Sequence, residues 1–167
     1  TLRPAQYCGF KFFNVYGPNE YYKGSMASVI FHTFNKIKET GEMGLFKSYR
    51  PDYADGQQLR DFVYVKDICK VVKFMIEHPD VNGLFNLGTG TARSFYDLAK
   101  ATFDALGLEP NIKFVEMPET LRKKYQYYTQ ANMEKLRAAG YHEAFYTLEE
   151  GCKDYVTNYL AQDYKTY

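Results

Sequence analysis

The chain has 167 residues, of which 46% are hydrophobic and 25% charged, and its formal net charge is +1. This apolar fraction and charge balance exclude a disordered chain, and no apolar run approaches the roughly 18–20 residues of a membrane span. The 21 basic and 20 acidic side chains lack the positive excess typical of nucleic-acid binding. The cysteines are odd in number and widely spaced, which predicts neither a disulfide framework nor a zinc site; they are Cys8, Cys69 and Cys152. We expect a soluble, cytoplasmic protein.

The first part of the chain alternates strand and helix patterns. Residues 9–15 are aromatic and β-branched and predict a buried strand that ends in a turn at 17–18. Apolar residues at helical spacing predict a helix from residue 26 to the stop signal at Gly41, with inward positions at Met26, Val29, Ile30, Phe34 and Ile37. The polar residues 49–58 predict a loop and residues 59–65 a strand. A second helix opens at Asp67, with inward positions at Ile68, Val71, Val72, Met75 and Ile76.

The second part continues the alternation and defines the α/β class. Residues 83–87 predict a short buried strand, and a helix follows from its cap at Ser94 to Gly107. Residues 112–115 predict another strand, and Thr129 caps a short helix that ends at Gly140. The spacing of residues 147–150 is that of a capping box and begins a last helix, with apolar positions at Tyr155, Val156, Tyr159 and Leu160.

The signals for a dinucleotide cofactor are weak. Gly88-Thr89-Gly90 follows a strand and precedes a helix, but Arg93 stands where the third glycine of the fingerprint belongs, which favours a plain tight turn. The spacing Tyr-x-x-x-Lys occurs twice, at 7–11 on a predicted strand and at 96–100 on the polar side of a predicted helix. Neither pair places a phenol and an ammonium together inside a site.

The segments around Asn14 and Arg60 carry the best candidates for a ligand site. Asn14 ends an apolar strand, and ligands of open α/β sheets bind outside the carboxyl ends of strands. Lys23 and Ser25 are expected at the N-terminus of a helix, which suits an anionic ligand. Arg60 begins a strand and has the geometry for bidentate phosphate binding, whereas Asp67 is most simply a helix N-cap.

Three motifs resemble the extended short-chain dehydrogenase/reductase family of nucleotide-sugar epimerases and dehydratases. They are Phe-Asn-Val-Tyr-Gly-Pro at 13–18, Arg-Asp-Phe-Val-Tyr-Val-x-Asp at 60–67 and Asn-Leu-Gly-Thr-Gly at 86–90. The stretches at 23–28, 124–131 and 136–141 are similar to the branch of that family that epimerises C6 of an ADP-heptose. The likeness covers residues 8–160 and only the C-terminal half of the family's length.

The resemblance implies an α/β fold that joins a C-terminal substrate-binding domain to the last strands and helices of a Rossmann-type doubly wound sheet. Residues 1–18 and 59–107 would belong to the Rossmann part, and residues 19–58 and 108–167 mainly to the substrate-binding domain. The N-terminal NADP-binding half, with its Gly-rich turn and its own Tyr-x-x-x-Lys, is absent from the sequence. We therefore expect the chain alone to be inactive.

The resemblance also implies a reaction, a precursor step of lipopolysaccharide core synthesis. NADP, one per subunit, would oxidise C6 of ADP-D-glycero-D-manno-heptose and reduce it again on the opposite face, giving the L-glycero epimer. Lys23 would be the acid/base for one face, and a tyrosine of the missing half would serve the other. The residues implied to contact the sugar nucleotide are Asn14, Ser25, His32, Phe46, Lys47, Ser48, Tyr49, Arg60 and Tyr125.

Within that set, the resemblance places residues 46–49 at the ADP end, Arg60 on the pyrophosphate and Tyr125 on the sugar side, with Val15 and Lys23 bordering the cofactor. It implies a homo-oligomer and no metal, nucleic acid or membrane partner. Two alternatives remain open: another nucleotide-sugar 4-epimerase or 4,6-dehydratase, against which the stretch at 23–28 argues, and a non-catalytic ADP-sugar-binding module. The loop at 49–58 is longer than is usual in the family, which leaves the contacts of residues 47–49 open.

Overall fold

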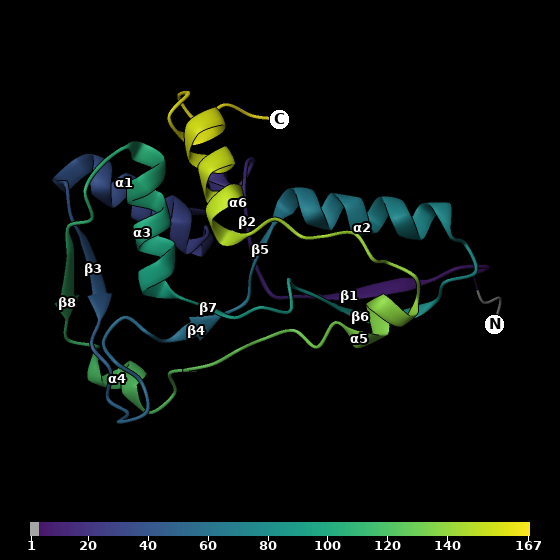
Figure 1. Ribbon diagram of the computed structural model, residues 1–167, viewed down its shortest axis with the longest axis horizontal. Coiled ribbons are helices and arrows are strands. Elements are labelled where there is room, and N and C mark those ends of the chain that lie inside the picture. The colour runs from purple at the N-terminus through teal and green to yellow at the C-terminus, as the bar shows by residue number, and fades with distance from the viewer. Residues whose placement is uncertain (1–3) are drawn as a thin grey trace.

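The computed structural model describes residues 4–167 and is an elongated α/β arrangement (Figure 1); residues 1–3, which begin the predicted range 1–18, lie outside the described part. The strands are β1 (Cys8–Phe12), β2 (Asn14–Tyr16), β3 (Met43–Phe46), β4 (Leu59–Arg60), β5 (Phe62–Tyr64), β6 (Gly83–Leu87), β7 (Arg93–Ser94) and β8 (Ile112–Val115). The α-helices are α1 (Val29–Thr40), α2 (Val65–Glu77), α3 (Phe95–Leu106), α4 (Glu119–Arg122), α5 (Glu134–Ala138) and α6 (Leu148–Tyr155). A 3₁₀ helix, η1 (Tyr21–Met26), precedes α1, and a π-helical turn, η2 (Val156–Leu160), continues α6.

Parallel strand pairs form the framework. β1 pairs with β6, β2 with β5 and β3 with β8, all parallel, while β4 and β7 are antiparallel. The chain changes partner at Phe13, whose amide donates to the carbonyl of Leu87 at 3.0 Å, whereas the next amide, of Asn14, donates to Asp61 at 3.0 Å. Parallel pairing with helical crossovers is the Rossmann-type organisation that the motifs predicted.

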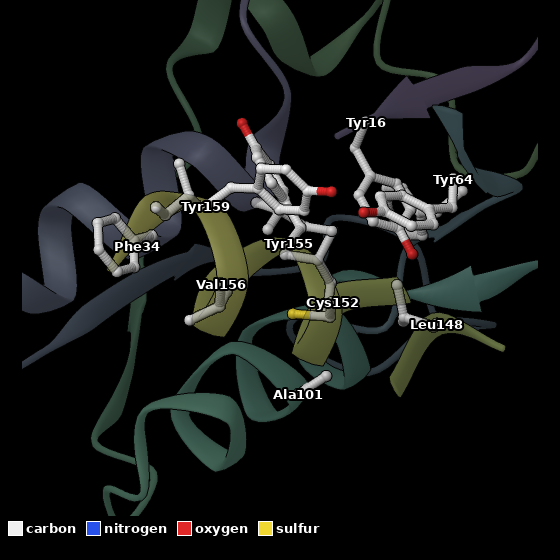
Figure 2. Packing of buried hydrophobic residues seen from close by; sticks show 13 residues of the cluster. Tyr16, Phe34, Tyr64, Ala101, Leu148, Cys152, Tyr155, Val156 and Tyr159 are labelled. Carbon is white, nitrogen blue, oxygen red and sulfur yellow. The ribbon is translucent and has the colours of Figure 1, made fainter. Parts of the chain in front are cut away.

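The strand β5 is buried on both faces and separates two hydrophobic clusters. Successive strand residues point to opposite sides. Phe62 and Tyr64 therefore face the cluster built with α1, α3 and α6 (Figure 2), and Val63 faces the cluster built with α2 and β6. In the first cluster the rings of Tyr16 and Tyr64 stack with centroids 5.3 Å apart. Gly151 allows α6 to approach, because a Cβ there would overlap the Tyr16 hydroxyl.

Buried carboxylates join segments that are distant in the sequence. Glu20 accepts hydrogen bonds from the Ser28 amide at 2.7 Å and from the Tyr155 hydroxyl at 2.9 Å, which ties η1 to α1 and α6. Asp67 accepts from the Tyr146 amide at 2.9 Å and pairs with Lys70 at 3.0 Å. Burial raises the pKa of Asp67. Asp67 is thus not the predicted N-cap: α2 begins two residues earlier, and Asp67 holds the segment before α6 against it.

The predicted strands at 9–15 and 59–65 are each divided in two. The first divides at Phe13 into β1 and β2, and the second at Asp61 into β4 and β5, because each half pairs with a different partner. The strand β3 was not predicted, since its four residues contain a glycine and lack a clear alternation. The strands predicted at 83–87 and 112–115 are confirmed.

Several predicted helix positions are wrong. Met26 lies in η1 and is 83% exposed, because α1 begins only after its N-cap Ser28. On α2, Val72 and Ile76 face outward, with Ile76 72% exposed. Thr129 does not cap a helix: its amide extends the backbone bonding of Leu59, and α5 begins only at Glu134. The other inward positions of α1 and α2 are buried or half-buried.

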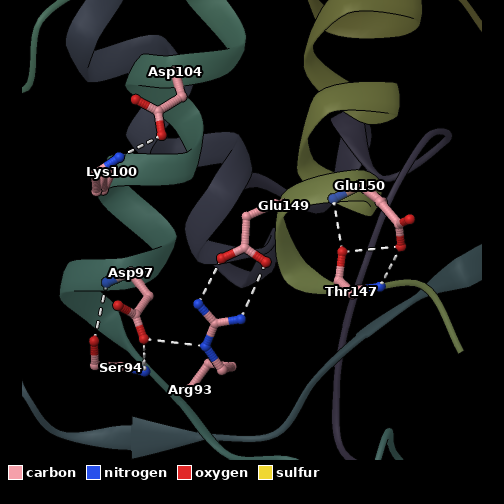
Figure 3. Close-up of polar contacts among 8 residues, drawn as sticks. All are labelled: Arg93, Ser94, Asp97, Lys100, Asp104, Thr147, Glu149 and Glu150. Carbon is pink, nitrogen blue, oxygen red and sulfur yellow. Dashed lines mark hydrogen bonds and ion pairs between the residues drawn. The ribbon is translucent and has the colours of Figure 1, made fainter.

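The helix boundaries that rest on local capping chemistry are confirmed. Ser94 and Asp97 form a capping box at the start of α3, and Thr147 and Glu150 form another at the start of α6 (Figure 3). Gly41 and Gly107 end α1 and α3 with φ of 72° and 69°, the left-handed conformation that glycine adopts without strain.

Within the described residues, no helix is long and apolar enough to cross a membrane. Over the same residues the three cysteines are free thiols, and no cluster of His, Cys, Asp and Glu side chains has the size of a metal site.

Candidate anion-binding site

Asp61 organises the polar centre of the molecule. Its carboxylate is fully buried. It accepts hydrogen bonds from the amide and hydroxyl of Thr89, both at 2.7 Å, and from the amides of Gly90 at 2.9 Å and Ala131 at 3.0 Å. Gly88 is required here, because a Cβ would lie 2.6 Å from Oδ2 of Asp61. The Gly88-Thr89-Gly90 turn therefore binds the Asp61 carboxylate of its own chain. This explains why its sequence looks like a phosphate-binding turn.

The guanidinium of the neighbouring residue, Arg60, lies over two aromatic rings. Its guanidinium carbon is 5.6 Å from the ring centroid of Phe95 and 5.5 Å from that of Tyr125. Nη1 donates to the carbonyl of Leu59 at 2.8 Å. Burial lowers the pKa of Arg60, yet a guanidinium stays charged at neutral pH. This half-buried cation thus retains N–H donors for an anion from outside.

The other arginines of residues 4–167 are occupied. Arg93 pairs with both oxygens of Glu149, at 2.5 and 3.1 Å, and with Asp97 at 3.1 Å (Figure 3). Arg50 pairs with Asp52, Arg122 lies 3.7 Å from Glu116, and Arg137 donates to two backbone carbonyls. Among the ion pairs of this part of the chain, none includes Arg60. A half-buried cation without an internal carboxylate is the electrostatic mark of an anion site.

The segment 46–49 borders the Arg60 cluster through Phe46. The ring of Phe46 meets that of Tyr125 edge-on, with centroids 6.1 Å apart. Gln58 is buried and donates to the carbonyl of Phe46 at 3.3 Å, which fixes the end of β3. The hydroxyl of Tyr127 accepts from the Tyr49 amide at 2.9 Å, so the aromatic segment at 125–127 also holds the start of the loop.

Lys47 and Tyr49 are directed toward a surface carboxylate. Lys47 pairs with Glu116 at 2.8 Å, and the Tyr49 hydroxyl donates to the same carboxylate. These bonds lower the pKa of Glu116 and raise the pKa of Lys47. Ser48 donates its amide to Asp55 at 2.7 Å within the loop. Phe46 therefore lies against the Arg60 cluster, whereas the three residues after it form the rim.

Asn14 and Val15 lie on β2, next to the Asp61 segment. The Asn14 side chain donates to the carbonyl of Asp61 at 3.2 Å. Val15 and Lys23 line an open hollow of about 230 Å³, together with Gly17 and Pro18. The turn at 17–18 thus connects the end of β2 to the segment that carries Lys23.

Lys23 and Ser25 are not at the N-terminus of α1, as the sequence predicted. Lys23 lies in the last turn of η1, and α1 starts after Ser28, whose hydroxyl accepts from the Phe31 amide at 3.2 Å. Gly24 breaks η1 with φ of 54° and ψ of −130°. The helix dipole of α1 therefore does not act directly on Lys23. Both side chains are exposed, and His32 is exposed on α1 beside Phe31.

The structure thus gathers the predicted site residues into two groups. Arg60, Phe46 and Tyr125 are in contact, and Val15 and Lys23 share the hollow. No side-chain hydrogen bond or ion pair of the described residues joins Ser25 or His32 to either group, although Ser25 follows Lys23 by two residues in η1. Sequence reasoning missed Phe95, Asp61 and Tyr127. The capping signal at Ser94 already placed Phe95 at the first position of α3, but no local pattern shows that its ring covers Arg60.

The fold and this site define a class: a Rossmann-type α/β protein in which the arginine at the end of β4 has no carboxylate partner within the described residues. The comparisons specify the family. The family model described as NAD dependent epimerase/dehydratase family matches residues 4–88. The match spans slightly more than half of the chain, and the protein belongs to this family, as its motifs predicted.

Individual relatives are more specific. The chain is 52% identical over 167 residues to the ADP-L-glycero-D-manno-heptose-6-epimerase of Fusobacterium nucleatum, covering 96% of this chain and 50% of the relative. It is 54% identical over 151 residues to the enzyme of the same name from Nitratidesulfovibrio vulgaris, covering 90% and 47%. The crystal structure of the Helicobacter pylori enzyme of that name superposes with a TM-score of 0.72 at 29% identity, covering 92% and 44%. The chain spans about half the length of these relatives.

Proposed function

We propose that this chain is the substrate-binding part of a nucleotide-sugar epimerase that inverts C6 of ADP-D-glycero-D-manno-heptose to the L-glycero form. The observation that carries the proposal is Arg60, a half-buried guanidinium within 6 Å of two ring centroids and without a carboxylate partner in the described residues. A pyrophosphate offers two adjacent anionic groups for its free donors, and such charge-assisted bonds are among the strongest in proteins. The identity to relatives named for this substrate supports the choice of the ADP-heptose.

The cofactor in this proposal is NADP, the particular nicotinamide dinucleotide implied by the motifs. The residues present fit one edge of it: Val15 offers an apolar wall and Lys23 a cation in the hollow of about 230 Å³ at the end of β2. This volume is below the roughly 300–1,000 Å³ of a complete small-molecule site. The Gly88-Thr89-Gly90 turn does not fit the phosphates, because Asp61 already occupies its amides. Bound NADP+ would accept a hydride from C6 and return it to the opposite face.

Lys23 has the role of the acid/base for one of the two epimers. It would take the proton from the C6 hydroxyl of that epimer on oxidation and return a proton to the same oxygen on reduction. A second group is needed for the other epimer, because the two hydroxyls point in different directions and one side chain does not reach both. Phe46 and Tyr125 would flank the nucleotide, and Asn14, Ser25 and His32 the sugar. A homo-oligomer in the cytoplasm completes the proposal.

The proposal is tested with the natural protein that carries this sequence. ADP-D-glycero-D-manno-heptose, UDP-glucose and dTDP-glucose are offered separately, and proton NMR follows the configuration at each carbon. Only the ADP-heptose should be converted. Conversion of a hexose at C4, or its dehydration, would contradict the proposal in favour of another enzyme of the family. No reaction together with ADP binding would leave a binding module.

The pyrophosphate contact has a direct test of its own. Arg60→Ala should weaken the binding of ADP itself by about 10- to 150-fold, because a charge-assisted bidentate contact contributes roughly 1.5–3 kcal/mol. Calorimetric titration of wild type and variant with ADP measures this. An unchanged affinity would return Arg60 to a purely structural role.

A further inference from the structure

Phe95 is the second aromatic ring beside Arg60, with Tyr125, and was not among the residues implied by the sequence. Both ring centroids are within 6 Å of the guanidinium carbon, at 5.6 and 5.5 Å. A cation at this distance over a ring face is attracted by the ring quadrupole. Two such rings and the hydrogen bond from Nη1 to the Leu59 carbonyl restrict the movement of the guanidinium, and its other N–H donors have no partner within the described residues.

Phe95 is itself held by a rigid element. It is the first residue of α3, directly after the capping box of Ser94 and Asp97. Its amide donates to the carbonyl of Gln58 at 3.2 Å, and its ring meets Phe62 edge-on at 5.7 Å and 80°. Its ring position is therefore set by the start of α3, by the Gln58 carbonyl and by the ring of Phe62 on β5.

A second arginine with two aromatic neighbours, Arg50, provides the contrast. Arg50 lies over the rings of Tyr53 and Tyr127, at 5.3 and 5.2 Å. Its guanidinium is bonded to both oxygens of Asp52, at 2.9 and 2.5 Å. Both guanidinium carbons are within 6 Å of two ring centroids, and only Arg50 is also bonded to a carboxylate of its own chain. The anion position is therefore internal at Arg50 and open at Arg60.

We propose that Phe95 is a positioning residue for the diphosphate of the ligand: it holds the Arg60 guanidinium in the plane in which two parallel N–H donors meet adjacent phosphate oxygens. The inference rests on the proposed function, since it requires Arg60 to bind that diphosphate. Phe95 itself does not touch the ligand and acts through Arg60 alone. A guanidinium whose orientation is fixed before binding loses less conformational entropy when its hydrogen bonds to the ligand form.

The test measures the affinity of ADP, and separately of inorganic pyrophosphate, for the natural protein by calorimetry. Phe95→Leu, which keeps an apolar side chain and removes the ring, should weaken both ligands by about 3- to 30-fold, the range of a cation–π contact. Phe95→Tyr, which keeps the ring, should stay within about twofold of wild type. The matched control is Tyr53→Leu, which removes one of the two rings beside Arg50. It should leave the affinities of ADP and of pyrophosphate unchanged.

A double-mutant cycle separates positioning from packing. In an Arg60→Ala background, Phe95→Leu should have no further effect on ADP affinity, because the group through which it acts is gone. An equal loss in both backgrounds, or no loss in the wild-type background, would overturn the inference and leave the proposed function standing. If Arg60→Ala alone leaves ADP affinity unchanged, the pyrophosphate contact of the proposed function fails. Should Phe95→Leu not fold, Phe95→Met repeats the cycle.

Discussion

Arg60 and Arg93 face each other across the β4–β7 ladder, and their surroundings differ sharply. Arg93 is bonded to Glu149 and Asp97, which tie β7 to α3 and α6 (Figure 3). Arg60 has two rings and one carbonyl. Like charges directly opposite each other in an antiparallel pair are destabilising. The chain neutralises Arg93 itself, whereas no ion pair of the described residues includes Arg60.

The same distinction separates Arg60 from its neighbour in the sequence. Asp61 is surrounded by four donors of its own chain and is closed to solvent. Adjacent residues thus have different roles. Asp61 joins three segments of the fold, whereas Arg60 is held by two rings and one carbonyl and keeps other N–H donors free of partners in the described residues. The charge of Asp61 is satisfied within the chain and maintains the structure, whereas under the proposed function the charge of Arg60 is satisfied by a ligand.

The largest expected effect extends this distinction to Lys23, which has no ion pair within the described residues and lines the hollow beside Val15. Lys23→Met in the natural protein should slow epimerisation by roughly 10²–10⁴-fold, the usual size of a general acid–base contribution. Substrate affinity should change far less. One epimer should still be oxidised through the other acid/base, and single-turnover kinetics from each epimer measures the difference.

The matched control for that prediction is Lys153→Met, since Lys153 is an exposed lysine of α6 without an ion pair in the described residues. It should leave the rate unchanged. Equal impairment from both epimers, or a loss confined to binding, would make Lys23 a contact of the ligand rather than an acid/base.

The next largest effect is on the free energy of unfolding and concerns Asp61, the charge that the chain satisfies internally. In Asp61→Asn one carboxylate oxygen becomes an NH₂ group that faces amide donors. Buried donors without an acceptor cost about 1–3 kcal/mol each, so unfolding should become easier by on the order of 3 kcal/mol. Urea unfolding followed by circular dichroism measures this. Asp52→Asn, at the exposed Arg50 pair, is the control and should change little.

Gly88→Ala disturbs the same contact, between Asp61 and the turn at 88–90, by adding a Cβ to the turn. A Cβ at residue 88 would lie 2.6 Å from Oδ2 of Asp61 and 2.7 Å from the Cβ of Ala131. The backbone must shift, and overpacking of this kind costs typically 1–3 kcal/mol. A variant as stable as wild type would show that the turn is loose and that Asp61 does not hold it.

The elements that could be predicted from the sequence are those fixed by local chemistry. The capping boxes at 94–97 and 147–150 and the glycine stops at 41 and 107 depend on side chains within one turn of the helix end. The strands β6 and β8 are short apolar runs between turns. The motif at 60–67 placed Arg60 at a strand, where the structure has it, whereas Asp61 lies in the break between β4 and β5.

The remaining features depend on contacts between distant segments. Asp61 divides a predicted strand because its donors come from residues 89, 90 and 131, which no local pattern connects to it. Phe95 reaches Arg60 only through the packing of α3 against the strands. Ile76 has the helical spacing of a core position yet is 72% exposed, because periodicity gives a face of the helix and not what lies against it.

A smaller effect distinguishes the two arginines of the ladder directly. Arg93→Gln should lower the free energy of unfolding by roughly 1 kcal/mol, the upper range for partly exposed ion pairs, and leave ADP affinity unchanged. Arg60→Gln should do the reverse, weakening ADP and leaving the urea midpoint close to that of wild type. The two variants are compared in paired urea and calorimetric titrations. If both variants lower stability equally, the distinction between the two arginines is wrong.

The smallest effect is the acid dependence of the Arg93 pair. The hydrogen bonds from Arg93 lower the pKa of Glu149, so this carboxylate releases its proton more readily in the folded protein than in the unfolded chain. Its stabilising contribution is therefore present above the unfolded pKa of about 4.3 and is lost as the pH falls through the lower, folded value. The Glu149 side chain is 54% exposed, which limits the contribution to less than about 1 kcal/mol.

Between about pH 5 and 3, wild type should lose this increment and Arg93→Gln should not, so their stabilities should converge in acid. Urea midpoints at a series of pH values measure the difference, and 1 M salt should reduce it at neutral pH. A gap that stays constant down to pH 3 would mean that Arg93 stabilises the fold by packing rather than through its charge.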